Sequence, residues 1–258
     1  GQPRHLDRDV ITVPALALSC ATREVLRMAD IVESMLRDVI VVFENNDRRL
    51  MDEISARDDD VDALHAAIKL YLTEVSRNEL AGEDSERFVE LITFTTNLEH
   101  IGDIIDTNLL QIADKKIKRK LDFSAHGRKD LAALHARVID QMRLGINVLV
   151  SRDVAMARRL MREKESFREV ERAAGDRHMD RLRDGEIATI ETSALHLDLL
   201  RDLKRVTSHI TSIAYPMLDA EGELRTSRLK VHLEGYDGGG ESDDQMPVRP
   251  RKKAGKKG

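Results

Sequence analysis

Three acidic residues near the middle of the chain are spaced so that they can bind one metal ion together. Glu99, Asp103 and Asp106 stand at positions i, i+4 and i+7. A helix that turns by about 100° per residue brings their side chains within about 60° of one another. Carboxylate oxygens are the ligands that Mg²⁺, Ca²⁺ and Mn²⁺ prefer, and iron also accepts them. The spacing therefore indicates a carboxylate site for a divalent or iron-type metal ion.

The same three acids have a second interpretation that involves no metal. Leu98, Ile101 and Ile105 form an apolar face beside them. An amphipathic helix of this kind buries its apolar side and turns its charged side to solvent, where Lys or Arg residues of a neighbour can pair with it. On spacing by itself, a solvated acidic face is the commoner outcome, so both interpretations stay open.

A second polar stripe near the end of the ordered pattern repeats this spacing. Asp198, Asp202, Arg205 and His209 stand at i, i+4, i+7 and i+11. Asp202 and Arg205 fit an ordinary ion pair within one helix. His209 can serve as a metal ligand, but a histidine at the surface or satisfied within the core is the commoner case.

The composition excludes several other classes of site. Cys20 is the sole cysteine, which excludes an internal disulfide and a cysteine-based zinc site and favours a reducing compartment. The net charge of −5 gives no general attraction to nucleic acid, so no nucleic-acid partner is expected. The chain has no glycine-rich phosphate loop and no glycine-flanked serine. We therefore expect a protein that is not an enzyme.

The hydropathy pattern favours a soluble chain. Its longest wholly apolar run is Val39–Phe43, far shorter than the roughly 18 residues that span a bilayer. No signal peptide is recognisable, and the first residue is Gly1, which favours a processed or excised segment.

Apolar residues recur every three or four positions in six successive segments, which predicts an all-α helical bundle. Aromatic residues make up 3% and charged residues 34%, a balance that suits long helices with polar faces. The expected helices cover residues 14–44, 50–78, 83–120, 131–151, 154–184 and 195–217.

The six segments divide into two groups of three. Placing Leu98 over Leu203 aligns the apolar residues of the third and sixth helices, and a break at Asp122–Gly127 separates the halves. We therefore predict one three-helix repeat at 14–122 and another at 123–230, packed as an elongated bundle. Residues 1–13 are expected to form a linker from a membrane part, and residues 231–258 a disordered charged tail.

Asn97–Asp103 resembles the acidic motif of the PhoU family, in which Glu and Asp stand four residues apart in the setting Leu-Glu-Arg-Ile-Gly-Asp. Ile104–Leu110 and Leu199–Pro216 are similar to the PhoU-like domain at the C-terminus of bacterial Na⁺/phosphate cotransporters (the Na/Pi cotransporter II-related family). The opening segment 3–18 is similar to the segment that joins the membrane part of those proteins to this domain. The likeness covers roughly residues 3–230 and implies two PhoU-like three-helix repeats.

This resemblance also implies which residues would bind metal. Glu99 and Asp103 match the motif of the first repeat, and Asp106 is an added candidate ligand. In the second repeat Lys204 and Ser208 occupy the motif positions. A metal site there would need Asp198 and Asp202, one turn earlier, to replace them.

The implied function is regulation of phosphate uptake by a cytosolic domain of a sodium-dependent phosphate transporter. Its partners would be metal ions and the membrane domain of the transporter, carried in the same full-length chain, on the cytoplasmic side of the bacterial inner membrane. A homodimer is compatible with this interpretation. Two alternatives stay open: a stand-alone PhoU-type regulator of phosphate uptake or signalling, and a metal-free helical scaffold for protein–protein interaction.

Overall fold

A computed structural model describes residues 1–222, and these residues form helices and no strands. The long helices confirm the predicted all-α class, and their bounds follow the apolar periodicity closely. They are α1 (Pro14–Asn45), α2 (Arg48–Val75), α3 (Glu83–Asp103), α4 (Leu110–Lys118), α5 (Ala125–Ser151), α6 (Val154–Arg183), α7 (Ile187–Ser212) and α8 (Tyr215–Ala220). A short 3₁₀ helix covers Arg8–Val10, and a π-helical turn covers Ile104–Leu109.

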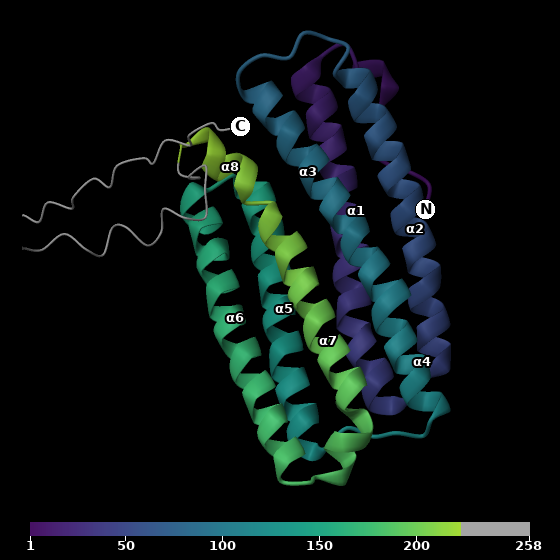
Figure 1. The fold of residues 1–258 in the computed structure, drawn as a ribbon. Helices are drawn as coiled ribbons and strands as arrows, with labels where there is room; N and C mark the ends of the chain where they lie inside the picture. Colours follow the sequence, from purple (N-terminus) through teal and green to yellow (C-terminus); the bar gives the residue numbers. More distant parts are fainter. Residues whose placement is uncertain (223–258) are drawn as a thin grey trace, which may run out of the picture. The chain divides into compact units, whose positions relative to one another are not determined.

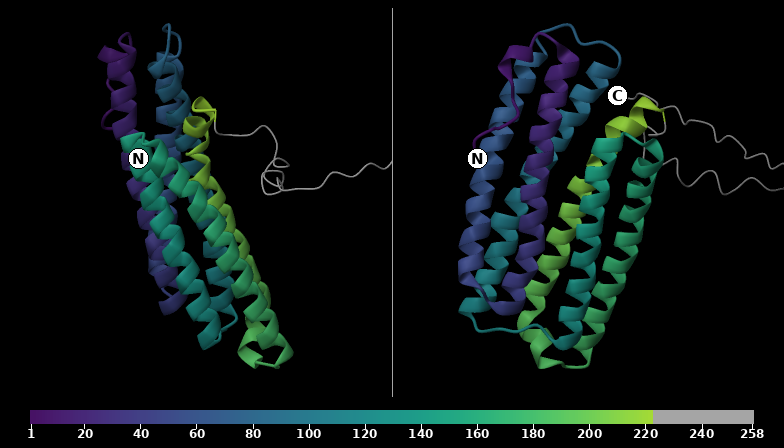
Figure 2. Two further views of the ribbon diagram at one scale, coloured as in Figure 1. Left: turned by 90° about the vertical axis from the view of Figure 1, so that its left-hand side faces the viewer. Right: turned by 180° about the vertical axis from the view of Figure 1, so that it is seen from behind.

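The helices pack as two groups of three (Figures 1 and 2). In the first group α1, α2 and α3 contact one another, and in the second α5, α6 and α7 do the same. The groups meet where α3 packs against α7 and α1 against α5. Each helix turns its aliphatic face into a shared core, whose burial is the main stabilising contribution.

Short polar side chains fix the ends of the helices where the sequence predicted breaks. The side chains of Asp47, Ser124 and Asp153 accept hydrogen bonds from backbone N–H groups in the first turns of α2, α5 and α6. Asn46 and Arg152 adopt the left-handed conformation at the ends of α1 and α5. These caps satisfy backbone groups that a helix end leaves unpaired and turn the chain into the next helix.

The structure differs from the predicted elements at several places. α5 begins at Ala125 and α7 at Ile187, earlier than the expected starts at 131 and 195. The helix predicted over 83–120 contains the π-helical turn between α3 and α4. The last predicted helix ends at Ser212, and Pro216 lies in the first turn of α8. Proline cannot donate the backbone hydrogen bond that a continuous helix needs, which explains the second break.

The segment predicted as a linker, residues 1–13, lies against α1 and α2. The backbone N–H groups of Arg4 and His5 donate to Glu24 Oε2 at 2.8 and 2.7 Å. Tyr71 of α2 donates through its hydroxyl to the carbonyl of Asp7 at 2.7 Å. Glu24 is fully buried and also pairs with Arg27 at 2.7 Å, so it ties this segment to the helices.

None of the described helices is long and apolar enough to cross a membrane. The charged tail predicted at 231–258 lies outside the described residues.

We expect Glu24→Gln to lower the free energy of unfolding by about 1.5–3 kcal/mol, the usual contribution of hydrogen bonds to a buried charged group. The substitution removes a charge that two backbone donors and Arg27 stabilise. Urea titration at neutral pH measures the change.

The matched control is Glu53→Gln, because Glu53 is more than half exposed and pairs with an even more exposed Arg49. This change should stay within about 0.5 kcal/mol, as surface ion pairs contribute little. Equal effects of the two substitutions would contradict the assigned role of Glu24.

Candidate metal site

Carboxylates of two helices meet between α2 and α3. Asp58 and Asp62 come from α2 and Asp103 from the end of α3, and one ligand oxygen of each lies within 4.8 Å of the others. Asp58 is 8% exposed, and its Oδ1 has no hydrogen-bond partner. A buried carboxylate oxygen without a partner is rare, because it loses hydration without gaining a bond.

Gly102 allows the two helices to approach closely enough for this arrangement. A Cβ atom at Gly102 would lie 2.5 Å from Asp58 Oδ1, closer than non-bonded atoms can come. The absence of a side chain at this position therefore leaves room for the buried carboxylate of Asp58.

The electrostatics of the cluster are unfavourable without a cation. Burial, followed by the charges of Asp106, Asp62 and Asp103, raises the pKa of Asp58 to about 7. Burial and the charge of Asp103 also raise the pKa of Asp62. Both shifts arise because the anionic forms lose hydration and repel one another.

These residues fit the divalent or iron-type metal ion that the sequence indicates. Three carboxylates that each bring one oxygen within 4.8 Å of the others form an oxygen-donor set. A cation bound there would neutralise the buried carboxylate of Asp58, whose Oδ1 has no hydrogen-bond partner. The cation would also cancel the repulsion that raises the pKa of Asp58.

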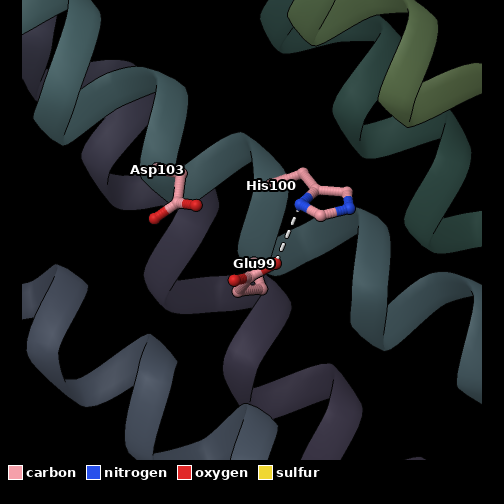
Figure 3. A group of neighbouring side chains, drawn as sticks. All are labelled: Glu99, His100 and Asp103. Carbon is pink, nitrogen blue, oxygen red and sulfur yellow. Dashed lines mark ion pairs between the residues drawn. The ribbon is translucent and has the colours of Figure 1, made fainter.

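Glu99 belongs to a second, neighbouring group. One ligand atom each of Glu99, His100 and Asp103 lies within 4.8 Å of the others, and His100 Nδ1 is 2.9 Å from Glu99 Oε2 (Figure 3). Asp103 therefore belongs to both groups. Asp106 is half-buried in the π-helical turn and acts on Asp58 through its charge.

Asp198 and Asp202, the ligands predicted for the second repeat, lie in ion pairs with arginines. Asp202 is fully buried and contacts Arg205 at 3.1 Å and Arg201 at 3.4 Å, while Asp198 pairs with Arg201 at 2.9 Å. Neither belongs to a cluster of ligand atoms among the described residues. A metal ion there would have to displace these guanidinium groups, and the role of Asp198 and Asp202 as ligands stays a prediction.

Asp58 and Asp62 were not expected at this site from the sequence. Their spacing of four residues was a usable signal, since it places both on one face of α2. That Asp58 and Asp62 lie opposite Asp103 depends on how α2 packs against α3, and helical periodicity does not specify this packing.

A separate hollow of about 420 Å³ lies between the two groups of helices. Its lining includes the apolar side chains of Phe43, Phe123, Leu199 and Leu203, and His135 lies at its wall. His135 Nε2 is 2.6 Å from the carbonyl of Leu36, so the histidine is held within the core.

The model of the PhoU domain family matches residues 25–110 and 131–217, once in each group of helices. A Salmonella typhimurium protein named for inorganic phosphate export, YjbB, is 41% identical over 220 residues, which are 84% of this chain and 40% of that protein. YjbB of Escherichia coli strain K12 is 39% identical over 222 residues. The chain thus spans about two fifths of the length of these relatives.

Other relatives match over nearly their whole length. The phosphate-specific transport system accessory protein PhoU homolog 1 of Thermotoga maritima is 24% identical over 232 residues, which are 88% of this chain and 95% of that protein. The crystal structure of PhoU from Pseudomonas aeruginosa superposes with a TM-score of 0.71 at 16% identity, over 80% of this chain and 97% of that one. PhoU from Streptococcus pneumoniae gives a TM-score of 0.72 at 14% identity, over 83% of this chain and 100% of that one. These structural matches show the fold.

We expect Gly102→Ala to weaken Mn²⁺ binding by at least about tenfold, because the new methyl group displaces the carboxylate of Asp58. Gly175→Ala in α6 is the control, since a Cβ there meets no atom within 4 Å. Calorimetric titration of both variants measures the difference, and unchanged Mn²⁺ affinity in Gly102→Ala would contradict the assignment.

The pKa of Asp58 also predicts a pH dependence for the metal-free protein. Between about pH 4 and 7 the folded chain holds a proton on Asp58 that the unfolded chain releases, so this group's contribution to the free energy of unfolding falls as pH rises. Asp58→Asn cannot titrate. The free energy of unfolding of Asp58→Asn should exceed that of the wild type by an amount that grows across this window. The difference should reach on the order of 3 kcal/mol and level off above pH 7.

Urea titrations in chelator at several pH values give this difference. A difference that is independent of pH would show that the pKa of Asp58 is not raised.

Proposed function

Because the chain belongs to the PhoU domain family, we propose that it is a regulatory protein of inorganic phosphate transport. The observation that carries this proposal is the match of the family model to both groups of helices, including the helices that hold the acid cluster. The names of the relatives, which refer to phosphate export and to a phosphate transport accessory protein, support the same substrate class. We propose no catalytic activity for the chain.

The comparisons support a PhoU-type regulator better than a domain of a sodium-dependent cotransporter. The Thermotoga maritima PhoU homolog and the solved PhoU proteins match this chain over almost their whole length. The names of the matched relatives contain no reference to sodium. Sodium coupling and a membrane part in the same chain therefore stay predictions.

The acid cluster gives this regulator a built-in response to cations. Asp58 and Asp62 of α2 and Asp103 of α3 would hold the ion, and the ion would supply positive charge between the two helices. Since α3 also packs against α7, a change in how α2 and α3 approach one another reaches the contact between the two repeats. This coupling is part of the proposal.

The partner we propose is the membrane domain of a phosphate transporter, contacted from the cytoplasmic side of the bacterial inner membrane. A homodimer is compatible with this arrangement. A metal-free helical scaffold, the remaining alternative, would bind the same partner but would not respond to cations.

The proposal is tested in the organism that encodes the chain, by deleting the coding region for residues 14–217 and measuring uptake and efflux of radiolabelled phosphate. We expect at least one of the two rates to change by twofold or more and to recover when the chain is supplied again. Unchanged uptake and efflux would contradict a role in phosphate transport. An immunoblot of the same cells shows whether the chain occurs separately or within a longer polypeptide.

We expect Mn²⁺ or Mg²⁺ to raise the melting temperature of the wild type and to have little effect on the double variant Asp58→Asn, Asp62→Asn. The reason is that a ligand that binds the folded state and not the unfolded chain stabilises the folded state, by an amount that grows with the logarithm of its concentration above Kd. The matched control is Asp59→Asn, because Asp59 is an exposed acid next to Asp58. If the double variant responds to the cation as the wild type does, the site lies elsewhere.

A further inference from the structure

The hollow between the two groups of helices has an apolar interior. Phe43 of α1, Leu109 of the π-helical turn, and Leu199 and Leu203 of α7 line it, and all four side chains are buried. The ring of Phe123 stands beside that of Phe43, with the centroids 6.4 Å apart. The volume of about 420 Å³ lies within the range of about 300–1,000 Å³ that is usual for pockets of small organic ligands. This interior therefore suits the apolar part of a small molecule and offers water few polar partners.

The polar groups in the buried wall of the hollow are neutral or already compensated. His135 Nε2 lies 2.6 Å from the carbonyl oxygen of Leu36, which can only accept, so this nitrogen carries the proton. Burial lowers the pKa of His135, and its ring is therefore neutral at neutral pH. The ammonium group of Lys116 bonds Asn46 at 2.8 Å and Asp122 at 3.1 Å. A charged group of a ligand must therefore find its partner at the opening of the hollow.

The opening of the hollow has an excess of positive charge. Arg128 and Lys129 line it, and both side chains are exposed. In the part of the chain that the structure describes, neither forms an ion pair, and Arg128 donates to the carbonyl of Phe123 at 3.3 Å. Because Asp122 is paired with Lys116, Glu44 is the one lining acid left to oppose these two cations. The opening therefore carries one positive charge more than it has negative charge to balance it.

The start of α5 adds to this positive potential. The N-terminus of a helix carries a positive partial charge and favours acidic side chains in its first turn. α5 has no acidic residue there, and Arg128 and Lys129 follow that turn directly. The adjacent Asp130 accepts hydrogen bonds from Arg177 at 2.6 Å and from Arg181 at 3.1 Å, so its charge is already used. An anion at the opening would relieve the repulsion between the two cations and the helix end.

We propose that the hollow binds a small amphipathic molecule with one negative charge. The apolar body of this molecule lies against Phe43, Leu199 and Leu203. Its anionic group lies beside Arg128 and Lys129. Because α1 belongs to the first repeat and α5 and α7 to the second, the molecule contacts both repeats and stabilises their association. The site has no residue in common with the acid cluster, and it does not depend on the proposed role in phosphate transport.

The test titrates the full chain with decanoate by calorimetry. Decanol has the same apolar body without the charge, and we expect it to bind at least about threefold more weakly, because it cannot pair with the two exposed cations. Acetate has the charge without the apolar body. We expect it to bind at least about tenfold more weakly than decanoate, because the burial of methylene groups is the larger contribution.

The location of the site is tested by filling the hollow. Ala132 lines the hollow and is exposed, so Ala132→Phe should leave the core intact and weaken decanoate binding by at least about tenfold. The matched control is Ala133→Phe, because Ala133 is the next exposed residue of α5 and does not line the hollow. Circular dichroism checks the fold of both variants. Wild-type affinity in Ala132→Phe, or an equal loss in Ala133→Phe, would overturn the proposed site.

The role of the charge is tested by removing the two cations. The double variant Arg128→Gln, Lys129→Gln should bind decanoate about three- to tenfold more weakly and bind decanol as the wild type does. The control Lys115→Gln, Arg119→Gln removes two exposed cations that do not line the hollow. Equal losses in the two double variants would overturn the proposed class of ligand, and so would equal affinities of the wild type for decanoate and decanol.

A second copy of the chain is the other occupant that an apolar hollow can have, and sedimentation of the wild type and of Ala132→Phe distinguishes it. We expect the two proteins to have the same mass in solution. A wild-type dimer that Ala132→Phe dissociates, together with no binding of decanoate, would assign the hollow to a second copy and overturn the proposal. The radiolabelled phosphate rates report on the proposed function independently of this result.

Discussion

The close approach of α2 and α3 brings carboxylates together in a place where they cannot all keep their charge without compensation. Asp58 is buried against Gly102, its Oδ1 has no hydrogen-bond partner, and the nearest charges are also negative. The apolar faces of the two helices stabilise the contact, and the acids oppose it. A proton or a cation relieves this conflict. We therefore expect the stability of the first repeat to depend on pH and, if the proposed site binds a cation, on the ions in solution.

The two repeats differ in what compensates the negative charge of a buried aspartate. In the second repeat, Asp202 is fully buried and is compensated by Arg201 and Arg205 of its own helix. The acids of the first repeat have no such guanidinium group beside Asp58 among the described residues. In the second repeat the compensating charge comes from arginines of the same helix, whereas in the proposed site of the first repeat it would come from a cation in solution. This asymmetry explains why a response to cations is expected from the first repeat.

The sequence predicted the helices well because their periodicity and capping residues are local properties. The break before Asp47 and the break at Ser151–Asp153 lie where short polar side chains cap the next helix. The spacing of Glu99 and Asp103 also identified one side of the candidate site. Asp58 and the pairing of Asn97 with His209 were not foreseen, because both depend on how distant helices face one another. Periodicity describes the face of each helix and contains no information on its partner.

The π-helical turn at Ile104–Leu109 has a consequence for the rotational phase of the chain. A π turn holds one residue more than an α turn, so the following helix is rotated by about 100° relative to an uninterrupted α-helix. In this rotated phase α4 directs Lys116 inward, where its Nζ bonds Asn46 at 2.8 Å and Asp122 at 3.1 Å. The side-chain positions of α3 and α4 are therefore rotated relative to each other about the helix axis, although the two helices are continuous through the π turn. Because of the extra residue, the acids near Asp103 can face α2 while Lys116 faces Asn46 and Asp122. Asp122 lies in the connection that leads to the second repeat.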